Sequence, residues 1–249
     1  MLDQYLMLKR KIIGVKFFFS EKDYENCTAK TIKGVMSYCT MIKKASTGAH
    51  FKANIENAGC SGGTPAVGLA PRTDDYIIGI PQYGAGLYCN IGTSARADKD
   101  IRYMPPVTKG LEIAPVNELD DYDVALVIDS PYNIMRIVQA YSYSHNIKKD
   151  FRLEGNQAIC SEVTAEPYMS QDINISLLCS GTRFFCKWDD EDMAVGIPQR
   201  LMESIEYGLR NTLNATESDQ RKEKMLADKL AGDVNVTMKT AYYYQMSSK

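Results

Sequence analysis

The stretch DDYDVALVIDSPYNIMRIVQAYSYSH, residues 120–145, decides the fold class of this chain. Its apolar run at 123–128 is short and rich in β-branched residues, which predicts a strand that is buried on both faces. Ser130 and Pro131 follow directly, and these are residue types that cap and open a helix. Apolar residues then recur at helical spacing, so we predict a strand that leads straight into a helix.

Strand and helix patterns also alternate in the rest of the chain. We expect strands at 11–19, 74–80, 173–178 and 182–188, and helices at 31–46, 198–213 and 215–229. Residues 81–118 are rich in Gly and Pro and are expected to form a long loop with short extended pieces. The predicted fold class is therefore mixed α/β (α+β).

Composition narrows the classes of function. Hydrophobic residues make up 45% of the 249 residues and charged residues 24%, which is typical of a globular protein. The net charge is −2, so no basic surplus indicates binding to nucleic acid. No apolar run reaches the length of a membrane span, and Lys9, Arg10 and Lys11 interrupt the apolar N-terminus without a cleavage site after them. We therefore expect a cytoplasmic protein that binds neither nucleic acid nor membrane.

Four of the seven cysteines fall into a repeated pattern. Cys60 and Cys179 each begin a Cys-Ser-Gly sequence, and Cys39 and Cys160 precede them at nearly equal distances. In a cytoplasmic protein the cysteines are expected to be reduced, so we do not expect a disulfide framework. The remaining roles for these thiols are core packing, catalysis and metal ligation. The spacing matches neither a zinc ribbon nor a ferredoxin-type cluster sequence.

The repeat extends beyond the cysteines. Ala-Val-Gly and an aliphatic residue follow each Cys-Ser-Gly, at 66–69 and 194–197, and a β-rich run opens each half. We predict an internal duplication that gives two pseudo-symmetric halves packed as one compact unit. The expected parts are a first half with the Gly/Pro-rich loop (1–118), a second half (119–214), and a charged helix and tail (215–249). Equivalent residues of two similar halves approach each other near a pseudo-twofold axis, so the four thiols are expected to meet at the junction.

The same residues resemble a known family. The early GVKF strand, GCSGG, the DVALVIDSPYNIM unit, NISLLCSGTR and DDEDMAVGIP together resemble the uncharacterised family called domain of unknown function 169. The resemblance covers residues 11–213 and includes the four repeated cysteines. It implies no assigned activity. The frequency of the family in anaerobic bacteria and archaea implies oxygen-sensitive redox chemistry.

The first functional hypothesis is an iron–sulfur redox protein. Cys39, Cys60, Cys160 and Cys179 would hold a [4Fe–4S] cluster between the halves, for electron transfer with a partner protein or for reduction of a small molecule. Zinc on the same thiols would make the site structural. The plainer interpretation is four buried thiols in two similar cores.

Other residues near the pattern carry their own alternatives. Arg183 would neutralise the cluster or bind an anionic substrate, or it would pair with the acidic run at 189–192. Cys27, Cys89 and Cys186 have no counterpart in the other half and are expected to be packing thiols. For Cys89 a fifth ligand or a redox partner is the further alternative.

Two more hypotheses belong to other classes. A cluster-free protein would wrap a small molecule in the loop PQYGAGLYCNIGTSARA at 81–97, whose Gly-x-Gly resembles a nucleotide loop only weakly. Thiol catalysis would need a base from His50 or His145, the only two histidines, each expected at the surface. The sequence leaves the choice between enzyme and electron carrier open and is compatible with a homo-oligomer.

Overall fold

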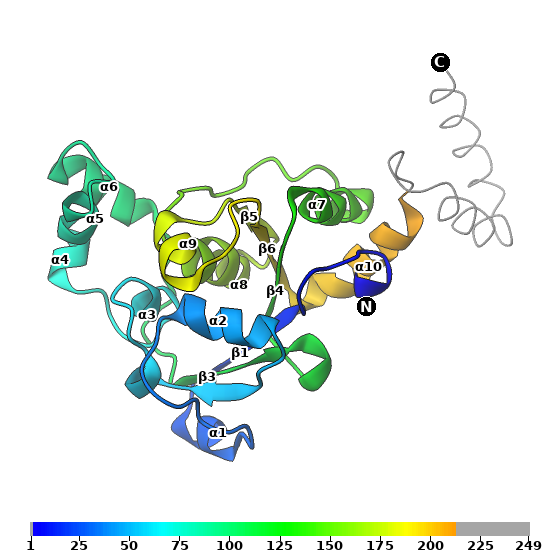
Figure 1. The fold of residues 1–249 in the computed structure, drawn as a ribbon, viewed down its shortest axis with the longest axis horizontal. Helices are drawn as coiled ribbons and strands as arrows, with labels where there is room; N and C mark the ends of the chain where they lie inside the picture. The colour runs from blue at the N-terminus through cyan, green and yellow to red at the C-terminus, as the bar shows by residue number, and fades with distance from the viewer. Residues whose placement is uncertain (1, 213–249) are drawn as a thin grey trace, which may run out of the picture.

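The computed structural model describes residues 2–212 and builds them around one six-stranded sheet (Figure 1). The strand order is β2-β3-β1-β4-β6-β5, and every neighbouring pair is antiparallel. The strands are β1 (Ile13–Phe18), β2 (Phe51–Ala53), β3 (Gly110–Pro115), β4 (Val124–Asp129), β5 (Asn174–Ser176) and β6 (Met193–Pro198). The mixed α/β prediction is confirmed, and the predicted helix at 215–229 lies outside the described residues.

Helices cover both faces of the sheet. They are α1 (Glu21–Asn26), α2 (Tyr38–Ser46), α3 (Gly63–Ala66), α4 (Asp74–Ile77), α5 (Ile80–Gly84), α6 (Ile91–Asp100), α7 (Pro131–His145), the π-helix η4 (Ala158–Ala165), α8 (Glu166–Ser170), α9 (Ser180–Cys186) and α10 (Met202–Asn211). Short 3-10 turns cover Leu2–Gln4, Ile55–Asn57, Val116–Glu118 and Gln199–Leu201. No helix within residues 2–212 is both long and apolar enough to cross a bilayer.

Strand β4 lies at the centre of the sheet and divides the core into two layers. Val124, Leu126 and Ile128 pack into the layer that contains α2 and η4, whereas Ala125 and Val127 pack into the layer that contains α7 and α10. The Ser130 side chain accepts a hydrogen bond from the Asn133 amide and caps α7, which begins at Pro131. The predicted doubly buried strand and capped helix are confirmed.

The sheet consists of two three-stranded parts that meet at the β1–β4 pair. From the outer strand inward the order is β2-β3-β1 in one part and β5-β6-β4 in the other. The register agrees as well: Ile13 lies opposite Pro115 as Val124 lies opposite Pro198. Phe51 lies opposite Ile113 as Asn174 lies opposite Gly196. The two parts therefore have the same strand order, direction and register.

The structure contradicts the predicted equivalence of the two Ala-Val-Gly segments. Ala66 ends helix α3, with Val67 and Gly68 in the turn after it, whereas Ala194–Ile197 lies within strand β6. By position in the sheet the counterpart of β6 is β3, since both are the middle strand of their part.

Three local predictions are also wrong. Residues 74–77 form helix α4 instead of a strand, and residues 81–118 contain α5, α6 and β3 instead of a long loop. Helix α2 begins after Ser37, because Thr31 and Met36 form β-bridges to Lys52 and Ala58.

Residues 182–188, predicted as a strand, lie mostly in helix α9. The aromatic residues that suggested a strand, Phe184 and Phe185, are 68% and 76% exposed. Thr182 and Cys186 are the buried residues of this helix, so the face that packs has helical spacing.

Candidate functional site

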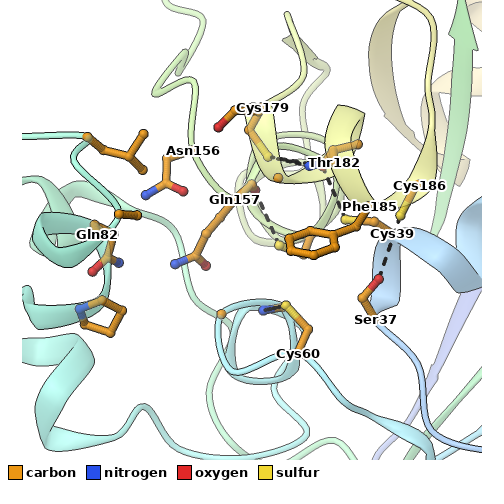
Figure 2. Close-up of a pocket in the computed structure, with 18 of the residues that line it drawn as sticks. Ser37, Cys39, Cys60, Gln82, Asn156, Gln157, Cys179, Thr182, Phe185 and Cys186 are labelled. Atoms are coloured by element: carbon orange, nitrogen blue, oxygen red, sulfur yellow. Dashed lines mark hydrogen bonds between the residues drawn. The ribbon is translucent and has the colours of Figure 1, made fainter.

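The four cysteines of the repeated pattern line a cavity of about 320 Å³. Figure 2 labels three of them, Cys39, Cys60 and Cys179. Each cysteine comes from a separate element: Cys39 from the first turn of α2, Cys60 from the turn before α3, Cys160 from the π-helix η4, and Cys179 from the N-cap of α9. The fold thus brings together residues that lie more than a hundred positions apart in the chain. Cys186, assigned to packing from the sequence, lines the same cavity.

The two Cys-Ser-Gly segments have the same local geometry. The Cys60 sulfur accepts a hydrogen bond from the Gly63 amide at 3.3 Å, and the Cys179 sulfur accepts one from the Thr182 amide at 3.4 Å. In both segments the amide three residues after the cysteine therefore donates to its sulfur. Amide N–H groups that point at cysteine sulfur in this way also hydrogen-bond to metal-bound sulfur in iron–sulfur sites.

The Thr182 hydroxyl links thiols from the two parts of the chain. Its Oγ1 lies 3.1 Å from the Cys179 sulfur and 3.4 Å from the Cys39 sulfur. Cys39 and Cys179 are therefore within two hydrogen-bond lengths of each other, although α2 and α9 are far apart in sequence.

Cys39 and Cys186 form a contacting pair of thiols. Their mutual hydrogen bond raises the pKa of Cys39 well above its usual range, and burial adds to this shift. The same hydrogen bond, with further ones from Thr40 and Ser37, lowers the pKa of Cys186 to about 6. One proton is therefore shared unequally within this pair, with Cys186 the more acidic thiol.

Cys160 is the most enclosed of these thiols. Burial raises its pKa well above the usual range, and the neighbouring sulfurs of Cys60 and Cys179 raise it further. Several thiolates held this close together repel one another, so a bound cation is what would stabilise them as a set.

Unusual backbone surrounds the cavity. Leu178 precedes Cys179 with φ 64°, Lys187 follows Cys186 with φ 55°, and Gln157 caps the Cys160 helix with φ 50°. Left-handed conformation is uncommon for residues other than glycine and costs on the order of 1–3 kcal/mol each. The helix that carries Cys160 is a π-helix, a rare form that is frequent at functional sites.

The segment at 81–97 forms another wall of the same cavity. Pro81, Gln82, Ala85 and Leu87 line it, so the cysteines and the predicted ligand loop share one site. Cys89 lies in this segment but is exposed and is not among the lining residues. Cys27 lies in a different depression, beside Glu112.

Arg183 and the two histidines do not line the cavity. The Arg183 guanidinium donates to the backbone carbonyls of Leu177, Asp189 and Asp192 and so ties down the segments on either side of α9. Arg183 is part of a helix instead of the predicted strand. Its hydrogen bonds go to backbone carbonyls, whereas the alternative from the sequence was a side-chain ion pair with the acidic run at 189–192. His50 bonds Glu112 and His145 bonds Ser204, so neither supplies a base to a cavity thiol.

Sequence reasoning missed Thr182, Cys186 and the carboxamide side chains of the cavity. A signal for the first two was present, because 179, 182 and 186 have the spacing of one helix face. Because residues 182–188 were predicted to form a strand, this helical spacing was not recognised. Nothing in the sequence marked Gln157, which reaches the site only through the turn before η4.

The type and arrangement of the donor atoms determine which metal group a site can hold. Within the part of the chain that the structure describes, no three His, Cys, Asp or Glu side chains are arranged to hold a single metal ion. Thiols are the donor type of both iron–sulfur clusters and zinc sites, so the chemistry of the lining donors fits either group.

Fold and site together define a class: a mixed α/β protein with an antiparallel sheet and a thiol-lined cavity between its two parts. The chain belongs to the domain of unknown function 169 family, described as uncharacterised ArCR, whose model matches residues 1–208. It is similar to the uncharacterized protein MJ0308 of Methanocaldococcus jannaschii, with 24% identity over 210 residues that cover 81% of this chain and 88% of the relative. No solved structure matches the chain.

Proposed function

We propose that this protein holds a [4Fe–4S] cluster through Cys39, Cys60, Cys160 and Cys179 and that its role is redox. The observation that supports the proposal is that four thiols from four separate elements line one cavity. Thiolates are the ligands of such clusters, and a bound cluster would supply one-electron chemistry. The electron would pass to a partner protein or to a small molecule in the same cavity.

The chain's own residues would tune such a cluster. The Gly63 and Thr182 amides and the Thr182 hydroxyl already donate to the sulfurs of Cys60 and Cys179. Hydrogen bonds to ligand sulfur shift the reduction potential of iron–sulfur sites. A cytoplasmic location, as the sequence predicts, would keep the thiols reduced and available.

An internal duplication would explain why the thiols are arranged in two similar pairs. In each part the first strand is followed by a helix without cysteine and then by a helix that carries one, and the second strand is followed by a Cys-Ser-Gly turn. The common strand order and register support the same origin for both parts. A pseudo-twofold relation would then place the four thiols beside the β1–β4 junction.

The test is the metal content of the full chain purified without oxygen. We expect a brown protein with about four iron and four acid-labile sulfide per chain, as a [4Fe–4S] cluster requires. Cys60→Ser and Cys179→Ser should each lose most of the iron, because each removes one of the four ligands. Iron and sulfide assays with visible spectra would measure both effects.

Cys27→Ser and Cys89→Ser are the matched controls, since neither thiol lines the cavity. Both should keep their iron. Full iron in Cys60→Ser and Cys179→Ser would contradict the proposal. One zinc per chain would make the site structural, and a colourless, metal-free protein would leave small-molecule binding as the function of the cavity.

A further inference from the structure

Three carboxamide side chains line the cavity together with the thiols. Figure 2 shows Gln82 and Asn156 on the side of the cavity away from Cys39 and Cys186, with Gln157 between the two sides. Gln82 and Gln157 are only 4% and 8% exposed. Within residues 2–212 neither of their Oε1 atoms has a hydrogen-bond partner, and the same holds for Nδ2 of Asn156.

A part-buried ion pair between Arg72 and the buried Asp98 fixes the orientation of the Gln82 carboxamide. Asp98 is 1% exposed, and its Oδ2 accepts from Arg72 at 2.7 Å. Its Oδ1 accepts from Gln82 Nε2 at 3.4 Å. A carboxylate paired with a guanidinium only accepts hydrogen bonds, so Gln82 must present its nitrogen to Asp98 and keep its oxygen free.

The same carboxylate fixes Gln157 through Tyr103. The Tyr103 hydroxyl donates its only proton to Asp98 Oδ1 at 2.7 Å, and its oxygen accepts from Gln157 Nε2 at 2.7 Å. Burial and the Asp98 carboxylate raise the pKa of Tyr103, so this proton stays in place. If the Gln157 amide were reversed, its Oε1 would face the Tyr103 oxygen, and neither atom could donate a proton to the other. The Gln157 Oε1 atom therefore also stays without a donor.

Two buried acceptors of fixed orientation therefore lack donors. Leaving such groups unpaired costs folding free energy, and a ligand that supplies the donors recovers it as affinity. Asp, Glu, Lys and Arg are missing from the described lining, so the carboxamide side of the cavity offers no charge for an ionic ligand. Leu87 and Phe185 add apolar surface beside the carboxamides.

We propose that Gln82 and Gln157 accept hydrogen bonds from the N–H groups of a small neutral amide, lactam or N–H heterocycle bound in the cavity. Asn156 Nδ2 would donate to the carbonyl oxygen of the same molecule. The identification of this molecule as the substrate rests on the proposed redox function, whereas its binding does not. At about 320 Å³ the cavity is at the small end of ligand sites, which limits the molecule to about one ring.

The test compares two probes of similar shape on the full, metal-free chain. Benzamide carries two N–H donors, and N,N-dimethylbenzamide carries none. Ligand-observed NMR titration should show that benzamide binds about tenfold tighter, the effect expected for one or two hydrogen bonds to buried acceptors. Equal affinities, or no binding of either probe at millimolar concentration, would overturn the proposal.

Two variants locate the effect. Gln82→Met and Gln157→Met keep the length of the side chain but remove the acceptor, so each should reduce the preference for benzamide to about threefold or less. Their affinity for the dimethyl probe should stay the same. Gln139→Met, on exposed helix surface outside the cavity, should keep the full preference. A preference that persists in both cavity variants would overturn the assignment to these residues.

Failure of this inference is distinguishable from failure of the cluster proposal. The two Gln variants should keep wild-type iron content when purified without oxygen, because neither residue is a proposed ligand. Probe discrimination without iron would uphold the carboxamide wall and reject the cluster. Iron binding without a preference for benzamide would uphold the cluster and reject the carboxamide wall.

Discussion

Cys186 is the cavity residue whose chemistry differs most from its sequence assignment. Its contact with Cys39, and hydrogen bonds from Thr40 and Ser37, lower its pKa to about 6. These contacts favour the thiolate form of Cys186 in the metal-free protein. The thiolate is the nucleophilic form of cysteine, so reactivity should follow this pKa.

We expect Cys186 of the metal-free protein to react with a small thiol reagent along a titration curve centred near pH 6. Methyl methanethiosulfonate, followed by peptide mass spectrometry between pH 5 and 9, would measure it. Exposed Cys89 is the internal control that shows the reagent is active at each pH. Modification of Cys186 only above pH 8 would show that its thiolate is not stabilised.

Glu154, in the loop before η4, is a second residue with shifted titration. Burial and the nearby Glu162 carboxylate raise its pKa to about 7. Its Oε2 is buried without a partner among the described residues. The folded state thus binds a proton that the unfolded state has released between about pH 4.5 and 7, so stability falls as pH rises through this range.

Glu154→Gln removes the ionisable group while it keeps the shape. The variant should be more stable than wild type at pH 8, on the order of 2 kcal/mol, and little changed at pH 4.5. Thermal unfolding at both pH values would measure the difference. Glu21→Gln, at an exposed side chain, is the control and should show no such pH-dependent gain. An equal gain at both pH values would contradict the titration.

At the scale of elements, the π-helix η4 depends on close contact with strand β6. A Cβ added at Gly196 would lie 2.1 Å from the Val163 carbonyl oxygen and 2.6 Å from Pro167. The corresponding position of the other part, Ile113 in β3, carries a large side chain, so this close approach is specific to the part with Cys160. Gly196 therefore determines how near Cys160 lies to the sheet.

We expect Gly196→Ala to destabilise the protein by about 2–4 kcal/mol and to lower iron binding, because η4 must move away from the sheet and take Cys160 with it. Chemical denaturation and iron content would measure the two effects.

Two other glycines separate general destabilisation from damage to the site. Gly208→Ala, where the added Cβ would lie 2.1 Å from the Ala140 carbonyl oxygen, should destabilise similarly but keep iron in the folded fraction. Gly84→Ala, with nothing within 4 Å, should change neither property by much. If Gly196→Ala and Gly208→Ala lost iron equally, iron binding would depend only on overall stability and not on the position of η4.

At the scale of the whole molecule, the two parts share one core. The layer that holds the thiols contains Ile13 and Met41 from the first part together with Ile159 and Trp188 from the second. The central strands β1 and β4 pair with each other across the junction. Neither part can bury its share of this layer alone.

We therefore expect fragments 1–118 and 119–249 to be unfolded when expressed separately and to assemble when expressed together. Size-exclusion chromatography and circular dichroism would measure assembly, and iron content would show whether the site forms. A cooperatively folded fragment 1–118 would contradict the dependence of each part on the other.

The sequence by itself determined the unit β4–α7, because its signals are local: a short apolar run, a capping Ser130 and helical periodicity. The sequence also indicated that the four repeated cysteines form one set, because a repeated motif in the same order can be recognised without knowledge of the packing. These features depend on neighbours in the chain, so they can be read without the fold.

Only the tertiary structure decided the shape and chemistry of the cavity. Residues 182–186 are helical because their buried face packs against α2 and Cys179 caps them, which overrides the local preference of two adjacent phenylalanines. The acidity of Cys186 and the orientation of Gln157 depend on Cys39, Tyr103 and Asp98, all distant in sequence. Hydrogen bonds and burial act through space, so these properties exist only once the chain has folded.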